Sequence, residues 1–247
     1  GESKVHIVDD AVSGTVMLYP LAKYDVTKLR SNFVHFAGNS LDGDPEVLCK
    51  SDAAPDLNKA VELIGWTPDT SIAHRWPHNS ALERKARHCE EVTRSLHLQA
   101  GFAIFPQLWP VSVYTTGVSI SAFGRPPSLL HEQGTEAELK KADQTCWEVA
   151  TGSPFPGPRY IVGQLVYYRS SGQSKFEPNA MPGLFAGWRV DPGLKYRGVL
   201  MVLDYKHLQE RRKVSTPIQV FEKEVYVKGS EPVFPLKERA DRELEKL

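Results

Sequence analysis

The stretch from Val47 to Arg94 constrains the fold of this chain more than any other. It begins with a short apolar run that ends at Ser51-Asp52, and a helical pattern follows from Pro55, which suits a first helical turn, to Gly65. Apolar residues recur in this pattern at helical spacing; they are Leu57, Ala60, Val61 and Ile64. The sequence therefore predicts a strand that ends in a carboxylate and is followed by an amphipathic helix.

A second helix is predicted to begin at Asn79 or Ser80, either of which can cap it, with Glu83 in its first turn. Its weakly apolar face is formed by Leu82, Ala86, Cys89, Thr93 and Leu96, and its charged face by Glu83, Arg87, Glu90 and Arg94. One carboxylate thus lies where a strand ends, and another lies just inside a helix. Carboxylate oxygens in such an arrangement are able to hold a divalent metal ion.

The segments SDAAPDL and WPHNSALERKAR resemble the second and third acidic motifs of retroviral and Copia-type retrotransposon integrases. Asp52 and Glu83 match the two motif carboxylates, and Asn79 and Arg84 match the framework of the third motif. The Asn-Gly that follows the aspartate in the family is Ala53-Ala54 in this chain. The resemblance implies an α/β fold with a ribonuclease-H-like integrase core, and an ancestral activity of metal-dependent strand transfer on DNA.

The opening residues, KVHIVDDAVSGTVMLYPLA, predict two strands joined by a turn at residues 11–14. They resemble the second and third strands of the integrase core. In that family the first catalytic aspartate lies on a preceding strand, so we expect a core that is truncated at its amino end. Asp9 and Asp10 are either substitute metal ligands or carboxylates at the turn, and the second interpretation is favoured.

The rest of the core is predicted from periodicity and from the resemblance. Residues 25–38 show the pattern of a helix, and TSIAH suits a short strand. Residues 106–122 match the closing helix of the integrase core by resemblance, but their β-branched and aromatic residues equally suit a strand.

A connector and a β-rich module are predicted after the core. TCWEVATGSPFPGP and KFEPNAMPGLFAGW are similar to segments that follow Copia-type cores, and residues 136–150 suit a short charged helix. Three apolar runs with turns between them predict a small all-β barrel or sandwich. EVYVKG suits one more strand, and the charged tail from residue 237 suits a helix. The predicted organisation is a catalytic core (1–123), a connector (124–158), a small β-barrel module (159–207) and a polar tail (208–247).

Composition limits the classes of partner and compartment. Acidic and basic residues balance at 30 each, so no strong overall field favours nucleic acid. The three cysteines are far apart and are interpreted as buried thiols, and the histidines lack the spacing of a zinc site. With neither a signal peptide nor a long apolar run, we expect a nuclear or cytoplasmic protein without a membrane partner.

The resemblance implies Mg²⁺ or Mn²⁺ as cofactor, held by Asp52 and Glu83. Because the family uses three carboxylates, we expect weak metal binding and impaired strand transfer. Its implied partners are DNA, as element ends and target, and other copies of the chain. The predicted DNA-binding residues are Asn79, Arg84, Lys85, Arg87 and Arg94.

Other interpretations remain open at this stage. Arg87 is the best candidate for a phosphate contact, and the alternative pairs it with Glu90 and Glu91 on a solvated face. Arg189, Lys195 and Arg197 are further candidate DNA contacts, and Trp188 is expected in the core. The alternative function is a non-catalytic nucleic-acid-binding or assembly protein derived from an integrase. A nuclease of the same superfold is a third.

Overall fold

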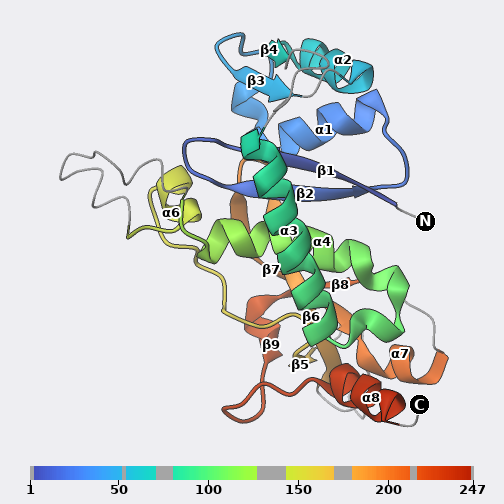
Figure 1. The fold of residues 1–247 in the computed structure, drawn as a ribbon. Helices are drawn as coiled ribbons and strands as arrows, with labels where there is room; N and C mark the ends of the chain where they lie inside the picture. The colour runs from blue at the N-terminus through green and yellow to red at the C-terminus, as the bar shows by residue number, and fades with distance from the viewer. Residues whose placement is uncertain are drawn as a thin grey trace.

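The protein is described by a computed structural model over residues 3–51, 54–70, 80–126, 143–169, 180–211 and 216–245, and it has a mixed α/β fold (Figure 1). The amino-terminal part consists of β1 (Lys4–Asp9), β2 (Val16–Leu21), α1 (Val26–Ala37), β3 (Leu48–Ser51), α2 (Pro55–Ile64), β4 (Thr67–Thr70), α3 (Ser80–Gln99) and α4 (Trp109–Phe123), with short 3-10 helices η1 (Asn39–Leu41), η2 (Phe102–Ile104) and η3 (Pro106–Leu108). The remainder consists of α6 (Cys146–Thr151), β5 (Leu165–Tyr168), β6 (Met181–Asp191), β7 (Lys195–Asp204), α7 (Tyr205–Arg211), β8 (Ile218–Phe221), the 3-10 helix η5 (Glu222–Glu224), β9 (Val225–Tyr226) and α8 (Pro235–Leu244).

The predicted hairpin is confirmed. Strands β1 and β2 pair antiparallel from Lys4 opposite Leu21 to Asp9 opposite Val16. Asp10 closes the turn, because its carboxylate accepts hydrogen bonds from the backbone N–H groups of Val12 and Ser13 at 3.2 and 3.0 Å. Its oxygens are therefore used within the turn, as the favoured interpretation of this residue requires.

The strand and helix predicted between Val47 and Gly65 are also present. Helix α2 begins at Pro55, ends at Gly65 in the left-handed conformation, and buries the predicted Ala60, Val61 and Ile64. It connects β3 to β4, which pair in parallel. A strand, β4, lies at Thr67–Thr70. The strand predicted at TSIAH begins at Thr70, and its other four residues lie outside the described part.

The amino-terminal strands form two separate pieces of sheet. Within the described residues, β1 pairs with β2 alone and β3 pairs with β4 alone. Helix α1 joins the two pieces, because it packs against both β1 and α2 and its Phe33 touches Trp66 at a ring-centroid distance of 5.3 Å. Hydrophobic packing against α1 thus connects the two strand pairs, between which the described residues form no strand pairing.

The ambiguous segment at residues 106–122 is a helix, α4, after a short 3-10 turn. It packs against β2 on one side and β6 on the other. Ser121 Oγ accepts from the N–H of Val16 and donates to its carbonyl, at 2.8 and 2.7 Å, and Thr115 Oγ1 donates to the carbonyl of Ala186 at 2.6 Å. Tertiary packing overrides the strand propensity here, since the small hydroxyl side chains find partners on both sides.

The β-rich module is a five-stranded sheet with the order β8-β7-β6-β5-β9. In the described part of the chain β8 pairs with β7 and β9 with β5, so the predicted barrel is not closed. The edges of a flat sheet of this size would lie about 19 Å apart, whereas the three residues of η5 can bridge at most about 14 Å. The sheet must therefore be strongly curled, which explains why its strand pattern resembles that of a barrel.

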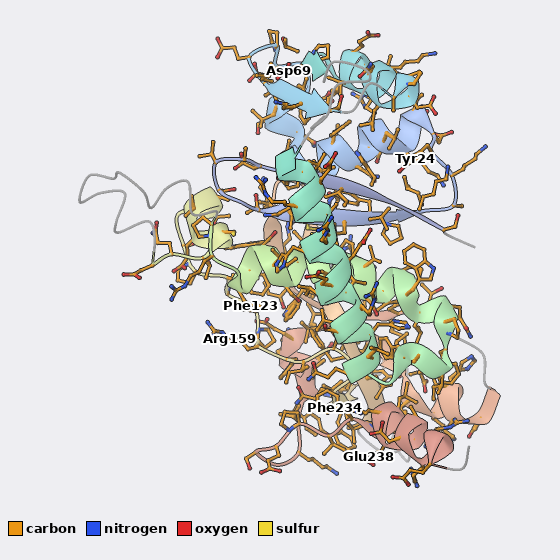
Figure 2. The ribbon with its side chains drawn as sticks, in the orientation of Figure 1. Tyr24, Asp69, Phe123, Arg159, Phe234 and Glu238 are labelled. Atoms are coloured by element: carbon orange, nitrogen blue, oxygen red, sulfur yellow. The ribbon has the colours of Figure 1, made fainter. Side chains whose placement is uncertain are left out.

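Buried residues connect the two halves. One cluster includes Phe33 and Trp66 from the amino-terminal part, Val118 of α4, and Trp188 and Leu200 of the sheet. The expected core position of Trp188 is confirmed: its side chain is 1% exposed and its ring N–H donates to the carbonyl of Pro158 at 2.9 Å. Near this cluster, Arg159 lies over the ring of Phe123 at 5.3 Å (Figure 2). None of the helices in the described part is both long and apolar enough to span a bilayer.

Candidate nucleic-acid interface

The two predicted metal ligands are placed unequally. Glu83 is exposed in the first turn of α3. Asp52 directly follows β3, whose last residue Ser51 is buried and donates a hydrogen bond to the Asn58 side chain at 3.3 Å, but Asp52 itself lies outside the described residues. The predicted Asn79 lies outside them as well.

The described residues do not assemble a metal centre. Within them, no group of three His, Cys, Asp or Glu side chains is arranged to hold a metal ion. Glu83 alone supplies the expected type of oxygen ligand at the position that the motif implies. The pairing of Asp52 with Glu83 therefore stays a prediction.

Helix α3 presents an exposed basic face. Arg84, Arg87 and Arg94 are exposed, and in the described part of the chain none of them forms an ion pair. In particular, Arg87 does not pair with Glu90 or Glu91. These guanidinium groups are therefore free to contact an anion such as a phosphate.

Lys85 has a different position from these arginines. It is half-buried, and its ammonium donates a hydrogen bond to the carbonyl of Gly14 in the hairpin turn at 2.8 Å. Its charge also opposes the effect of desolvation, which raises the pKa of Asp9. Lys85 thus fixes the start of α3 onto the β1–β2 turn, and the predicted contact of this residue with DNA would require that bond to be exchanged.

The opposite side of α3 faces the hairpin and α4. Cys89 is 2% exposed, and burial raises the pKa of its thiol to about 11, so the thiol stays protonated at neutral pH. Cys49 and Cys146 are also free, and burial raises their pKa values. Burial of these side chains indicates that they contribute to packing.

Two basic residues of the sheet form ion pairs with one carboxylate. Arg189 and Arg197 approach Asp191 at 3.4 and 3.1 Å, while Lys195 is exposed. Both arginines thus share one carboxylate partner, whereas Arg84, Arg87 and Arg94 of α3 form no ion pair within the described residues.

An exposed aromatic group on the curled sheet was missed by sequence reasoning. Tyr167 and Tyr226 stack at 5.8 Å, Lys228 lies 4.4 Å from the Tyr167 ring, and Phe221 is 54% exposed beside Lys223. The signal in the sequence is an aromatic residue next to lysine in two short strands, VFEK and VYVK. Such a pattern indicates a ring that is packed by a lysine stem and remains partly exposed.

No family model matches this sequence, and no curated protein matches it. Among solved structures, the chain is similar to one in the cryo-electron-microscopy structure of the simian T-cell lymphotropic virus intasome in complex with the PP2A regulatory subunit B56 gamma. The two share 14% sequence identity with a TM-score of 0.39, over 92% of this chain and 72% of that chain.

Proposed function

We propose that this chain is a retrotransposon integrase-like protein that binds DNA through the exposed basic face of α3, and in which metal-dependent strand transfer is impaired. The observation that carries the proposal is the set of exposed arginines Arg84, Arg87 and Arg94, which lack ion-pair partners in the described part of the chain and share a helix with Glu83. Their guanidinium groups suit phosphate oxygens. The element ends and the target DNA are the proposed partners, with self-association of the chain during assembly.

The order of elements supports a ribonuclease-H-like core. An antiparallel hairpin is followed by α1, by a parallel strand pair with α2 between its strands, and then by α3 with Glu83 in its first turn. The separation of β1–β2 from β3–β4 is what a core without its first strand would show.

Asp52 and Glu83 are the residues that would hold Mg²⁺ or Mn²⁺. Such ions activate an attacking hydroxyl and stabilise the leaving oxygen in phosphoryl transfer. The chain's own contribution is to position the DNA: the arginines of α3 contact phosphates, and Lys85 holds α3 against the hairpin. Two carboxylates leave more of the ion's coordination to water than three would, so we expect weak metal binding.

The test is a comparison of DNA binding and strand transfer. Replacement of Arg84, Arg87 and Arg94 by Gln should weaken binding to a duplex of the element end and reduce the slope of log K against log salt by about 2 to 3. The matched control replaces Lys23, Lys28 and Lys59, exposed residues away from α3, by Gln and should leave the slope unchanged. Equal losses in both triple variants would contradict the proposed interface.

Mg²⁺ separates the candidate functions. Slow strand transfer that Glu83→Gln abolishes supports the impaired enzyme. DNA binding without any metal-dependent chemistry favours the non-catalytic integrase-derived protein. DNA hydrolysis without strand transfer would identify a nuclease instead.

A further inference from the structure

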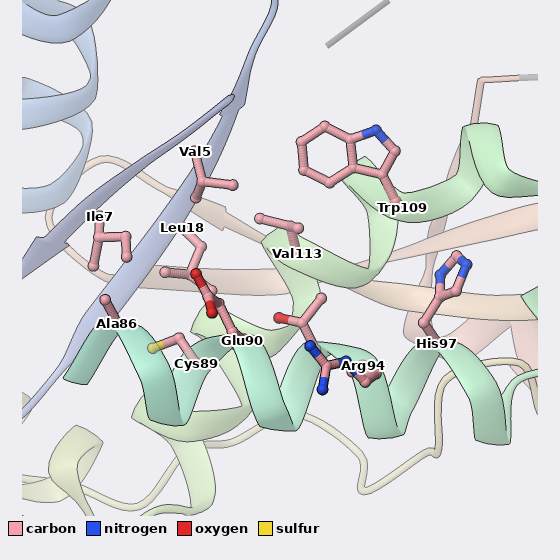
Figure 3. Close-up of a pocket in the computed structure, with 11 residues that line it drawn as sticks. Val5, Ile7, Leu18, Ala86, Cys89, Glu90, Arg94, His97, Trp109 and Val113 are labelled. Carbon is pink, nitrogen blue, oxygen red and sulfur yellow. The ribbon is translucent and has the colours of Figure 1, made fainter. Parts of the chain in front are cut away.

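A cavity of about 370 Å³ lies between α3, α4 and the β1–β2 hairpin (Figure 3). Val5, Ile7 and Leu18 of the hairpin form its floor, and Trp109 and Val113 of α4 form a wall. Its volume lies within the usual range of small-molecule sites, and its lining is mostly apolar, as in such sites. Neither the metal ligands nor the DNA-binding face proposed above accounts for this cavity.

The cavity exists because the inward side of α3 carries short side chains. Ala86, Cys89 and Thr93 lie on consecutive turns over the hairpin and do not fill the space above its floor. Thr93 is held by a hydrogen bond to Thr116 of α4 at 3.0 Å, which keeps the two helices at this separation. Burial raises the pKa of the Cys89 thiol to about 11, so this side chain presents a neutral, weakly polar surface to the cavity at neutral pH.

Two opposite charges border this apolar space. Glu90 and Arg94 both line the cavity from α3, one helical turn apart (Figure 3). Both are exposed, and neither forms an ion pair within the described residues. His97 lies at the end of the cavity, where its Nδ1 and the Ser112 hydroxyl share a hydrogen bond of 2.9 Å; burial lowers its pKa, so the ring is uncharged at neutral pH.

We propose that this cavity binds a small zwitterionic molecule with a large apolar side chain, its ammonium group at Glu90 and its carboxylate at Arg94. Each end of the ligand then makes a charge-assisted hydrogen bond to an unpaired side chain. Its apolar body covers the floor formed by Val5, Ile7 and Leu18. A free amino acid with an aromatic side chain has this chemistry. The site shares Arg94 with the proposed DNA interface but is otherwise separate from it.

A competing arrangement is an ion pair between Glu90 and Arg94 themselves, which their spacing on the helix allows. In that case the two charges cancel, and only the apolar floor recognises a ligand. This arrangement predicts equal binding of zwitterionic, anionic and cationic molecules with the same apolar body. The proposal predicts a preference for the zwitterion.

Three indole compounds distinguish these cases: L-tryptophan, 3-indolepropionate, which lacks the ammonium group, and tryptamine, which lacks the carboxylate. Binding is followed in methyl NMR spectra of the full chain, at Val5, Ile7, Leu18 and Val113. We expect saturable shifts at these methyl groups, with each truncated compound bound about tenfold more weakly than L-tryptophan. Equal affinities, or no shifts up to the solubility limit of tryptophan, would overturn the proposal.

Variants assign the binding to this cavity. Glu90→Gln should weaken L-tryptophan about tenfold and leave 3-indolepropionate unchanged, because the second compound has no group for Glu90. Ala86→Leu, which keeps a strong helix former while filling the cavity, should abolish binding of all three compounds. Glu91→Gln is the matched control outside the cavity and should bind like the parent. Retained L-tryptophan binding in Ala86→Leu would overturn the site. Methyl NMR signals away from the cavity that match those of the parent show that the variant is folded.

Discussion

Helices α3 and α4 follow each other in the chain and cross in the structure, yet they differ in their exposure to solvent and in their charge. α3 is amphipathic: its inward side is short and weakly apolar, and its outward side carries Glu83, Arg87 and Arg94. α4 is buried on both sides and carries no charged residue. The comparison indicates that α3 displays chemistry to the solvent while α4 connects the hairpin to the curled sheet.

The two helices also differ in whether their polar side chains form hydrogen bonds within the protein. On α4, Ser112, Thr115, Thr116 and Ser121 are buried and hydrogen-bonded, so each hydroxyl fixes a neighbour at short distance. On α3 the exposed charges make no such bonds within the described residues, apart from Lys85. Substitutions on α4 should therefore change stability, and substitutions on the outward face of α3 should change binding.

The largest expected effect is at Gly117 of α4. A Cβ at this position would lie 2.7 Å from the backbone nitrogen of Leu18, closer than real Cβ contacts. Gly117→Val should therefore force α4 away from β2 and destabilise the protein by more than about 4 kcal/mol, or prevent folding. Urea unfolding measures the change. The control Leu98→Val, at an exposed position of α3, should stay within about 0.5 kcal/mol. A stable Gly117→Val protein would contradict the role assigned to α4.

A smaller loss is expected for Ser121→Ala. The substitution removes both hydrogen bonds to the backbone of Val16 and leaves buried polar groups without a partner. The expected cost is about 1 to 3 kcal/mol in the free energy of unfolding. Ser95→Ala on exposed α3, whose hydroxyl bonds only to the carbonyl of Glu91, is the matched control and should cost less than about 0.5 kcal/mol. Equal losses of stability in Ser121→Ala and Ser95→Ala would contradict the proposed difference between the hydroxyl groups of α4 and those of α3.

The contrast between the amphipathic α3 and the buried α4 also explains which parts of the fold can be predicted from the sequence. The hairpin and helices α1, α2 and α3 follow from local signals, namely turn residues, caps and one-sided periodicity, as with Pro55 and Gly65 around α2. α4 lacks such a signal because it is apolar on all sides, so its type depends on the partners that meet it. The open, curled sheet could not be distinguished from a barrel, since closure depends on pairing between distant edges.

In the candidate site, too, some features are predictable from local sequence and others depend on tertiary structure. The exposed positions of Arg84, Arg87 and Arg94 on one helix were predictable from spacing. The bond from Lys85 to Gly14 and the cavity over Leu18 were not, because both depend on how α3 lies across the hairpin. The paired placement of Asp52 and Glu83 depends on tertiary geometry in the same way, and it stays a prediction.

On the binding side of the comparison, Arg87→Gln should weaken DNA binding without changing stability. Loss of one phosphate contact should reduce the slope of log K against log salt by about 1. The free energy of unfolding should change by less than about 0.5 kcal/mol, because the side chain is exposed and forms no ion pair in the described part of the chain. Fluorescence anisotropy across a salt series gives the slope, and an unchanged slope would remove Arg87 from the interface.

The smallest expected effect concerns the contact between the two helices at His97. Its Nδ1 shares a hydrogen bond with Ser112, and burial lowers its pKa below the ordinary value of 6.5. At a pH between the lowered pKa of the folded protein and the value of 6.5 in the unfolded chain, His97 binds a proton in the unfolded chain but not in the folded protein. The free energy of unfolding is therefore highest above pH 6.5 and falls as the pH drops below that value. His97→Asn removes the titrating group and should flatten this dependence, which urea unfolding across the pH range measures. An NMR titration in which His97 protonates with the ordinary pKa of 6.5 would show that the helix crossing is open to water, and α4 would then be less enclosed than its hydrogen bonds indicate.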